Sequence, residues 1–264
     1  SAKTMLTQMI HRDWNRASII IWSIGNETPF SDARMDFMID LKETAEGLDS
    51  SRLISAALLS GSVEQFRSLT YFLAKEGLKH SFVSDYEKAI FKQIVSQLQP
   101  LYGSMDTFKI NIKDPLAEHL DIIAYNEYFG WYYTSFIVDQ LGVEESTLRK
   151  LMFKLMPTIK IESQYKKPIH ISEFGAGAKR NFKADGGIWS EEYQEDVYRH
   201  QLEMIQNNNQ IQGLSPWILK DFRSMMRPLA GVQDFYNRKG LVDEDGKKKK
   251  AFKVLQQFYQ DGWE

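Results

Sequence analysis

Ser18-Ile-Ile-Ile-Trp-Ser-Ile-Gly-Asn-Glu27 is a segment in which an apolar, β-branched run leads directly into the polar pair Asn26 and Glu27. A continuous run of this kind predicts a strand buried on both faces, as in parallel sheets. In parallel α/β proteins, reactive groups collect at the carboxyl ends of the strands. The segment therefore predicts an α/β fold and makes Glu27 a candidate for chemistry.

Four more strand-like runs follow this segment along the chain. They are Leu53–Leu58, Leu120–Tyr125, Ile169–Ser172 and Leu214–Leu219. Helical patterns lie between the runs: one follows Ser31 as a plausible N-cap, and another begins near Ser190 with two glutamates in its first turn. Because strands alternate with helices, the sequence predicts parallel β/α units.

The stretch from about Gly61 to Asp114 interrupts this alternation and has helical patterns of its own, such as Tyr86 to Leu98. We interpret it as a helical insertion after the second strand, at the rim where barrel active sites are formed. We assign its aromatic residues to a small core of the insertion rather than to sugar-binding platforms. They are Phe66, Tyr71, Phe72, Phe82 and Tyr86.

Composition and charge exclude several classes of function. The chain has 264 residues, 43% of them hydrophobic, which suffices for one core of barrel size or for two smaller domains. A net charge of −2 provides no field of one sign that would recruit nucleic acid or an anionic membrane. The longest early apolar run, Ala17 to Ile24, is too short to span a bilayer. The lysine run Lys247–Lys250 is interpreted as a solvated helix start.

The chain contains no cysteine, which excludes disulfides, thiolate chemistry and cysteine-based metal sites. Its five histidines show no metal-ligand spacing, so we expect neither a metal nor another cofactor. A soluble protein of the bacterial cytoplasm and one exported to the periplasm both fit a cysteine-free sequence. The compartment therefore remains open.

Carboxylates follow two of the predicted strands, at Glu27 and Glu173. Two carboxylates at separate strand ends of one sheet are the minimum for glycoside hydrolysis. One protonates the leaving oxygen, and the other attacks the anomeric carbon or activates water. A glutamate that ends a strand is also commonly a loop anchor or an arginine partner, so the pair by itself leaves catalysis open.

The residues around these strand ends resemble glycoside hydrolase family 2, in an order that covers nearly the whole chain. Arg12-Asp-Trp-Asn15 through Glu27 resembles the acid/base segment, although the family usually has His-Pro where this chain has Arg16-Ala17. Leu120 to Tyr132 resembles the sixth barrel strand, and Lys167 to Gly175 resembles the nucleophile strand. Two further matches are Trp189-Ser-Glu-Glu-Tyr-Gln194 and the series Trp217, Asp221, Phe222, Arg223.

The resemblance implies a (β/α)8 TIM barrel and a role for each matched residue. Glu27 would be the general acid/base and Glu173 the nucleophile of a retaining mechanism, with the two carboxyl groups about 5–5.5 Å apart. The implied sugar contacts are Asn26 at the 2-hydroxyl, Tyr128 orienting the nucleophile, Trp217 against the sugar face, and Asn126 and Tyr132 as further contacts or walls.

The substrate is implied by Asn237-Arg-Lys239-Gly240, which resembles the Asn-x-Lys motif of β-glucuronidases. An ammonium paired with the C6 carboxylate makes a charge-assisted contact, whereas a neutral sugar would leave Lys239 partly desolvated and unpaired. We therefore expect terminal β-D-glucuronides as carbohydrate substrates. A β-galactosidase or β-galacturonidase of the same family, or a non-catalytic carbohydrate-binding module, are the alternatives.

Counted against the resemblance, the chain begins at the helix before the fourth barrel strand. Residues 1–264 would then be the C-terminal part of the catalytic domain, with strands four to eight and their helices. Five strands cannot close an eight-stranded barrel, which leaves two sheet edges exposed. We expect little or no activity unless the missing N-terminal part, a partner chain or self-association into a homo-oligomer completes the barrel.

Overall fold

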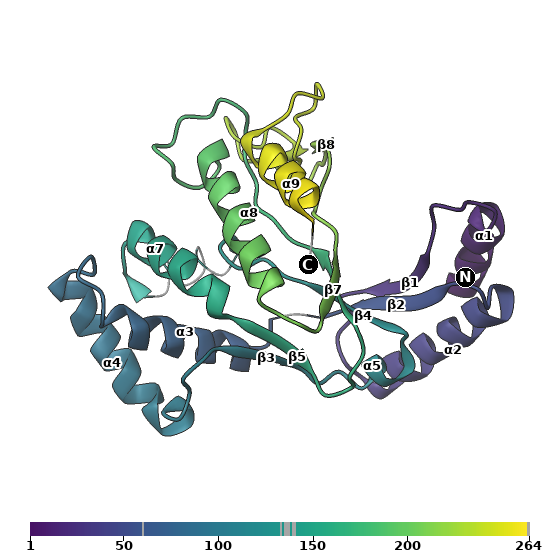
Figure 1. Ribbon diagram of the computed structural model, residues 1–264, viewed down its shortest axis with the longest axis horizontal. Coiled ribbons are helices and arrows are strands. Elements are labelled where there is room, and N and C mark those ends of the chain that lie inside the picture. Colours follow the sequence, from purple (N-terminus) through teal and green to yellow (C-terminus); the bar gives the residue numbers. More distant parts are fainter. Residues whose placement is uncertain (60, 133, 135–137, 139–140, 263–264) are drawn as a thin grey trace.

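The computed structural model describes residues 1–59, 61–132, 134, 138 and 141–262 (Figure 1). Its helices are α1 (Ala2–Asp13), α2 (Asp32–Leu48), α3 (Val63–Gly77), α4 (Asp85–Tyr102), α5 (Leu116–His119), α7 (Glu145–Leu155), the 3-10 turn η1 (Met156–Thr158), α8 (Glu191–Gln206) and α9 (Lys250–Asp261). Its strands are β1 (Ile21–Asn26), β2 (Leu53–Leu58), β3 (Lys109–Ile112), β4 (Ile122–Asn126), β5 (Lys160–Ser163), β6 (Ile169–Glu173), β7 (Ile211–Leu214), β8 (Phe222–Arg223) and β9 (Tyr236–Asn237).

Five strands form the main sheet in the order β1-β2-β4-β6-β7, and each neighbouring pair is parallel. The predicted α/β fold with a parallel sheet is therefore confirmed. Since every strand runs the same way, the residues that end β1, β4 and β6 meet at one edge of the sheet. Within the described residues the sheet does not close, because β1 and β7 each have one neighbouring strand.

Serine N-caps explain where two of the helices begin: Ser31 was predicted as a cap, and the second helix was predicted to begin near Ser190. The Ser31 hydroxyl accepts a hydrogen bond from the Arg34 amide (3.1 Å), and the Ser190 hydroxyl accepts one from the Tyr193 amide (3.0 Å). Each bond satisfies a backbone donor that the first helical turn leaves free. Beyond its cap, α2 buries Met38, Leu41 and Ala45 at three- and four-residue spacing.

The first predicted strand is shorter and more exposed than expected. It begins at Ile21 rather than Ser18, because the Ile19 amide closes a turn onto the Arg16 carbonyl (3.1 Å). Ile20 is 69% exposed, and within β1 only Trp22 is buried. The expectation of burial on both faces is wrong, since β1 lies at the edge of the described sheet.

The last predicted strand is also misplaced. The observed strand is β7, which ends at Leu214, and the residues from there to Leu219 mostly form the loop that follows it. Pro216 has no amide to donate to a ladder, and the following residues bond to other loops. The Trp217 amide donates to the Phe174 carbonyl (3.0 Å), and the Ile218 amide donates to the Lys239 carbonyl (3.1 Å).

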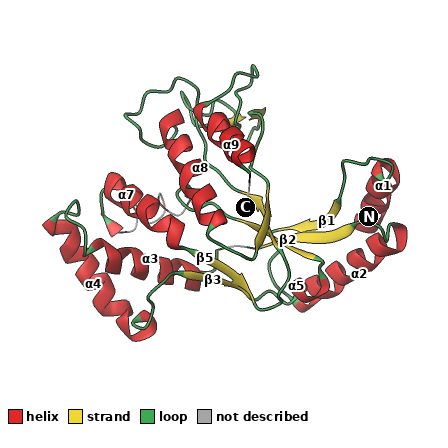
Figure 2. Cartoon of the chain, viewed as in Figure 1, coloured by secondary structure: helices red, strands yellow, loops and turns green. Residues whose placement is uncertain are grey.

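The predicted insertion at about 61–114 contains α3, α4 and β3 (Figure 2). Strand β3 pairs in parallel with β5, in a two-stranded sheet separate from the main one. Tyr71 and Phe72 are buried, but Phe72 belongs to the same hydrophobic core as the main sheet, not to a separate core of the insertion. Phe82 and Tyr86 are exposed, so assigning them to that core was wrong.

Helix α9 packs against α8, near the end of the chain (Figure 1). The lysine run does precede a helix, and Lys247, Lys248 and Lys250 are exposed. Lys249 is fully buried, however, so its assignment to a solvated helix start was wrong. In the part of the chain that the structure describes, no helix is both long enough and apolar enough to cross a membrane.

Candidate active site

An amide bridge joins the strand ends at the carboxyl edge of the main sheet. Asn126, which ends β4, donates from Nδ2 to Glu27 Oε1 and to Asn26 Oδ1, both at 3.1 Å. Its own Oδ1 accepts a hydrogen bond from the Ser172 hydroxyl at 2.7 Å. Asn126 thus fixes the Glu27 carboxylate relative to β6, the strand that carries Glu173.

The backbone of Glu27 has an unusual conformation. Its φ is +49°, in the left-handed region that side-chain-bearing residues rarely adopt. The Glu27 amide donates to the Ala57 carbonyl of β2 (2.9 Å), which holds this conformation in place. Strained residues that are held in this way cluster at functional sites, which motivates a functional hypothesis for Glu27.

Glu173 is held by a tyrosine from the loop after β4. The Tyr128 hydroxyl donates to Glu173 Oε2 at 2.6 Å. Burial and the bonded carboxylate raise the pKa of Tyr128 above its ordinary value, so the phenol keeps its proton and remains a donor. One oxygen of Glu173 is therefore engaged, which leaves the other available for chemistry.

A cavity of about 440 Å³ opens over this edge of the sheet. It is lined by Glu27, Tyr128, Tyr132, Glu173, Trp217, Arg227, Asn237 and Lys239. All the predicted site residues except Asn26 and Asn126 line it. Those two lie beside it, through the amide bridge to Glu27.

Lys239 is a buried cation that lines this cavity. Its ammonium lies 4.1 Å from the centre of the Tyr128 ring and 4.4 Å from that of Tyr132, and it donates to the Tyr132 hydroxyl. Ring faces attract cations, although burial lowers the pKa of Lys239 below its usual value. The Asn237 Oδ1 accepts a bond from the Lys239 amide (3.1 Å), so its NH2 group is left to donate elsewhere.

Residues 2–261 match the profile of the family described as "Glycosyl hydrolases family 2, TIM barrel domain". The chain belongs to glycoside hydrolase family 2. The match spans almost the whole chain and agrees with the parallel sheet, which in the described residues is an unclosed part of the family's barrel.

Relatives of this family 2 chain include two bacterial proteins. A Formosa agariphila protein, provisionally named a β-glucuronidase, is 26% identical over 98% of this chain and 27% of its own length. A Paenibacillus borealis β-glucuronidase is 23% identical over 95% of this chain and 32% of its own length. The chain thus spans about a third or less of the relatives it matches.

Solved structures of the family share the fold. A β-galacturonidase from Eisenbergiella tayi, solved with galacturonate, superposes with a TM-score of 0.64 at 22% identity. It covers 98% of this chain, which in turn covers 36% of that enzyme. A Faecalibacterium prausnitzii β-glucuronidase superposes with a TM-score of 0.62 at 20% identity. The superposition covers 99% of this chain and 34% of the length of that enzyme.

Two residues of this family 2 site were missed from sequence. Ser172 anchors Asn126, and Arg227 lines the cavity from the segment between β8 and β9. Among the described residues, no carboxylate forms an ion pair with the half-buried Arg227. Arg227 does not follow a strand of the main sheet, so the strand-end rule could not find it.

Proposed function

We propose that this chain carries both catalytic carboxylates of a retaining glycosidase that removes terminal β-D-glucuronic acid from glucuronides. The observation that carries the proposal is Lys239, a buried ammonium in the same cavity as Glu27 and Glu173. Taking a cation out of water is costly unless a partner compensates. The C6 carboxylate of a uronic acid is a partner of matching charge.

In the first step, a Glu173 oxygen attacks the anomeric carbon while the bond to the aglycone oxygen breaks. Glu27, in its protonated form, gives its proton to that departing oxygen. The product is a glycosyl ester on Glu173. Tyr128, which donates to Glu173 Oε2, orients the carboxylate for attack.

In the second step, the Glu27 carboxylate removes a proton from water, and the resulting oxygen attacks the anomeric carbon. The ester bond to Glu173 breaks, which restores both carboxyl groups and retains the configuration. The Asn126 bond to Glu27 Oε1 keeps the carboxylate facing the sugar in both steps. Trp217 forms a wall of the cavity and would pack against the sugar ring.

Arg227 adds a second cation to the cavity and strengthens the case for an acidic sugar. It lines the same space as Lys239, and the two positive charges repel, which contributes to the lowered pKa of Lys239. A uronate would relieve this repulsion, whereas a neutral galactoside would not. A β-D-galacturonide carries the same carboxylate and is the alternative substrate.

The substrate proposal is tested with a panel of nitrophenyl β-glycosides on the chain supplied with the three preceding barrel strands. We expect glucuronide hydrolysis to exceed galactoside hydrolysis. Lys239→Ala should lower kcat/KM for the glucuronide by about 100-fold, the loss of one charge-assisted contact, and barely change galactoside hydrolysis. Equal losses on both substrates would contradict carboxylate recognition by Lys239.

The nucleophile is tested separately with a 2-fluoro glucuronide that carries a good leaving group. We expect a stable adduct on the peptide that contains Glu173, detected by mass spectrometry, and no adduct in Glu173→Gln. A non-catalytic carbohydrate-binding module would bind the compound without becoming labelled, which would refute the proposed reaction.

A further inference from the structure

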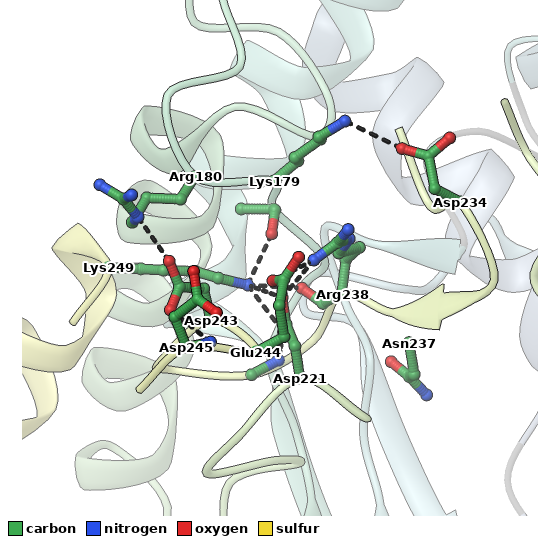
Figure 3. Close-up of polar contacts among 12 residues, drawn as sticks. Lys179, Arg180, Asp221, Asp234, Asn237, Arg238, Asp243, Glu244, Asp245 and Lys249 are labelled. Atoms are coloured by element: carbon green, nitrogen blue, oxygen red, sulfur yellow. Dashed lines mark hydrogen bonds and ion pairs between the residues drawn. The ribbon is translucent and has the colours of Figure 1, made fainter. Parts of the chain in front are cut away.

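A buried cluster of charges adjoins the backbone segment 237–240. Figure 3 shows the cluster together with Asn237. The side chains of Asp221 and Lys249 are both 0% exposed, and that of Arg238 is 4% exposed. The Lys249 ammonium is 2.8 Å from Asp221 Oδ1 and 2.9 Å from Oδ2. The Arg238 guanidinium is 3.3 Å from Asp221 and also pairs with Glu244.

Stability alone is a poor explanation for such a cluster. Desolvating two ions costs several kcal/mol each in a real protein, and well-packed apolar residues often replace a buried pair without loss. Burial accordingly raises the pKa of Asp221 and lowers that of Lys249. Both changes favour the neutral form of the group over its charged form. The bonds that the cluster makes to the backbone point to another role.

These backbone bonds flank Lys239 on both sides. Lys249 donates to the Arg238 carbonyl (3.1 Å), and Asp221 Oδ1 accepts a hydrogen bond from the Gly240 amide (2.8 Å). A Cβ at Gly240 would lie 2.4 Å from Asp221 Oδ1, so only glycine permits this approach. The peptide units before and after Lys239 are thus fixed by the cluster.

The same cluster reaches the loop that follows the Glu173 strand. Lys249 donates to the Ala178 carbonyl at 2.6 Å, and the Ala178 amide donates to the Arg238 carbonyl at 2.9 Å. This loop and the Lys239 segment are therefore held together both by a direct backbone bond and by Lys249, which bonds to a carbonyl of each. These bonds therefore fix the position of Lys239, which would contact the C6 carboxylate, relative to the strand that carries Glu173, which would contact the anomeric carbon of the same sugar.

Successive side chains of residues 237–239 point alternately toward the cavity and toward the cluster. Arg238 points into the cluster, whereas Asn237 and Lys239 line the cavity. In Figure 3, Asn237 lies outside the cluster and its side chain points away from it. The backbone bonds to Arg238 and Gly240 therefore determine where the Lys239 and Asn237 side chains begin.

We propose that Asp221 and Lys249 are positioning residues that hold the 238–240 backbone so that Lys239 and Asn237 meet the carboxylate of a uronide. They would thereby set the preference for uronides over neutral glycosides without touching the sugar. This inference rests on the proposed function of Lys239.

The test compares Asp221→Asn, Lys249→Met and the variant with both changes, each in the chain with the three preceding barrel strands supplied. Nitrophenyl β-glucuronide and β-glucoside are the substrates. We expect KM for the glucuronide to rise about 10- to 100-fold, the loss of a charge-assisted contact, with a smaller change in kcat. For the glucoside, kcat/KM should stay within about twofold, because no carboxylate is recognised.

The double variant separates positioning from folding. Removing both charges avoids an unpaired buried ion, so its melting temperature should recover relative to the single variants. Its preference for the glucuronide should remain low, because the bonds from Lys249 to the Arg238 and Ala178 carbonyls are absent. In Asp221→Asn, hydrogen exchange of the Gly240 amide should also accelerate.

A matched control lies in the same view. Lys179 and Asp234 form an ion pair at 2.9 Å whose side chains are 32% and 44% exposed (Figure 3). Lys179→Met and Asp234→Asn should leave the substrate preference unchanged. A stable double variant of Asp221 and Lys249 with wild-type preference would overturn the positioning role alone. A wild-type enzyme that prefers the glucoside would instead refute the proposed function.

Discussion

At the scale of single residues, two tyrosines of the candidate site, Tyr128 and Tyr132, bind different partners. Tyr128 donates its hydroxyl hydrogen to Glu173, while the Tyr132 hydroxyl accepts one from Lys239. Both rings also face the Lys239 ammonium. The two hydroxyls therefore bond to different groups: that of Tyr128 to Glu173, the proposed nucleophile, and that of Tyr132 to the Lys239 ammonium.

We predict that Tyr128→Phe and Tyr132→Phe have different kinetic effects. Tyr128→Phe should lower kcat about 10- to 100-fold on charged and neutral substrates alike, because a hydrogen bond to a charged nucleophile is lost. Tyr132→Phe should raise KM for glucuronides only. Steady-state kinetics on nitrophenyl glucuronide and glucoside distinguish the two, and the same pattern in both variants would contradict this division.

Glu127 provides a prediction about pH. Its carboxyl group is fully buried, and this burial raises its pKa to about 8, whereas an unfolded glutamate titrates near pH ~4.3. Between these values the folded chain holds a proton that the unfolded chain has released. The free energy of unfolding should therefore fall as the pH rises from about 4.3 to 8, and this contribution is fully lost above that window.

Glu127→Gln should remove this contribution, because an amide does not titrate. At pH 8 we expect the variant to exceed the wild type in free energy of unfolding by on the order of 4 kcal/mol, with a much smaller difference at pH 5. Urea denaturation at the two pH values measures both differences. If the two proteins differed in free energy of unfolding by the same amount at both pH values, Glu127 would be ionised in the folded chain.

At the scale of elements, the ends of helices and strands determine where side chains project. Helix α4 begins with a capping box in which Ser84 and Glu87 satisfy each other's backbone amides. Glu87 is buried and also accepts a bond from the Glu144 amide (3.2 Å), near the start of α7. The cap of α4 is thereby coupled to a second helix.

We predict that Ser84→Ala destabilises the chain more than Ser62→Ala, the corresponding change in the capping box of α3. Each loses a cap worth about 1 kcal/mol. Ser84→Ala additionally frees a buried carboxylate, Glu87, from its hydroxyl donor at 2.7 Å, whereas the bonds around Ser62 are exposed. Denaturant unfolding compares the two, and an equal loss would show that burial of the cap is unimportant.

At the scale of the whole molecule, the described sheet is open along β1. Apolar side chains remain exposed there, among them Met5 at 70% and Ile20 at 69%. A hollow of about 690 Å³ lies against α1 and β1, lined in part by Met9 and Ile24. Exposed sheet edges and apolar patches of this kind mark surfaces that other chain segments cover.

We predict that the chain gains activity when a segment supplying the first three barrel strands is added or joined to it. Closure should fix both carboxylates and exclude water, so glucuronide hydrolysis should rise by about 100-fold or more. The binding of an apolar dye to the chain should fall in parallel. Full activity of residues 1–264 alone would refute the need for closure.

Local features of the sequence were sufficient to predict much of this architecture. Strand β2 begins and ends at the predicted residues, Ser31 caps α2 as expected, and α8 begins next to Ser190 as expected. Such features depend on neighbouring residues, because hydrogen bonds and side-chain periodicity act over a few positions. The strand-end rule also selected Glu27 and Glu173, which the fold brings to one cavity; their catalytic roles remain proposals.

The sequence by itself determined which residues can form strands, helix caps and reactive strand ends, whereas only the tertiary structure decided which distant groups meet. Lys249 belongs to a lysine run that looks solvated, yet it is buried against Asp221, 28 residues away. Arg227 reaches the cavity from a loop that follows no strand of the main sheet. Burial and charge pairing depend on how non-adjacent segments pack, and no local pattern encodes that packing.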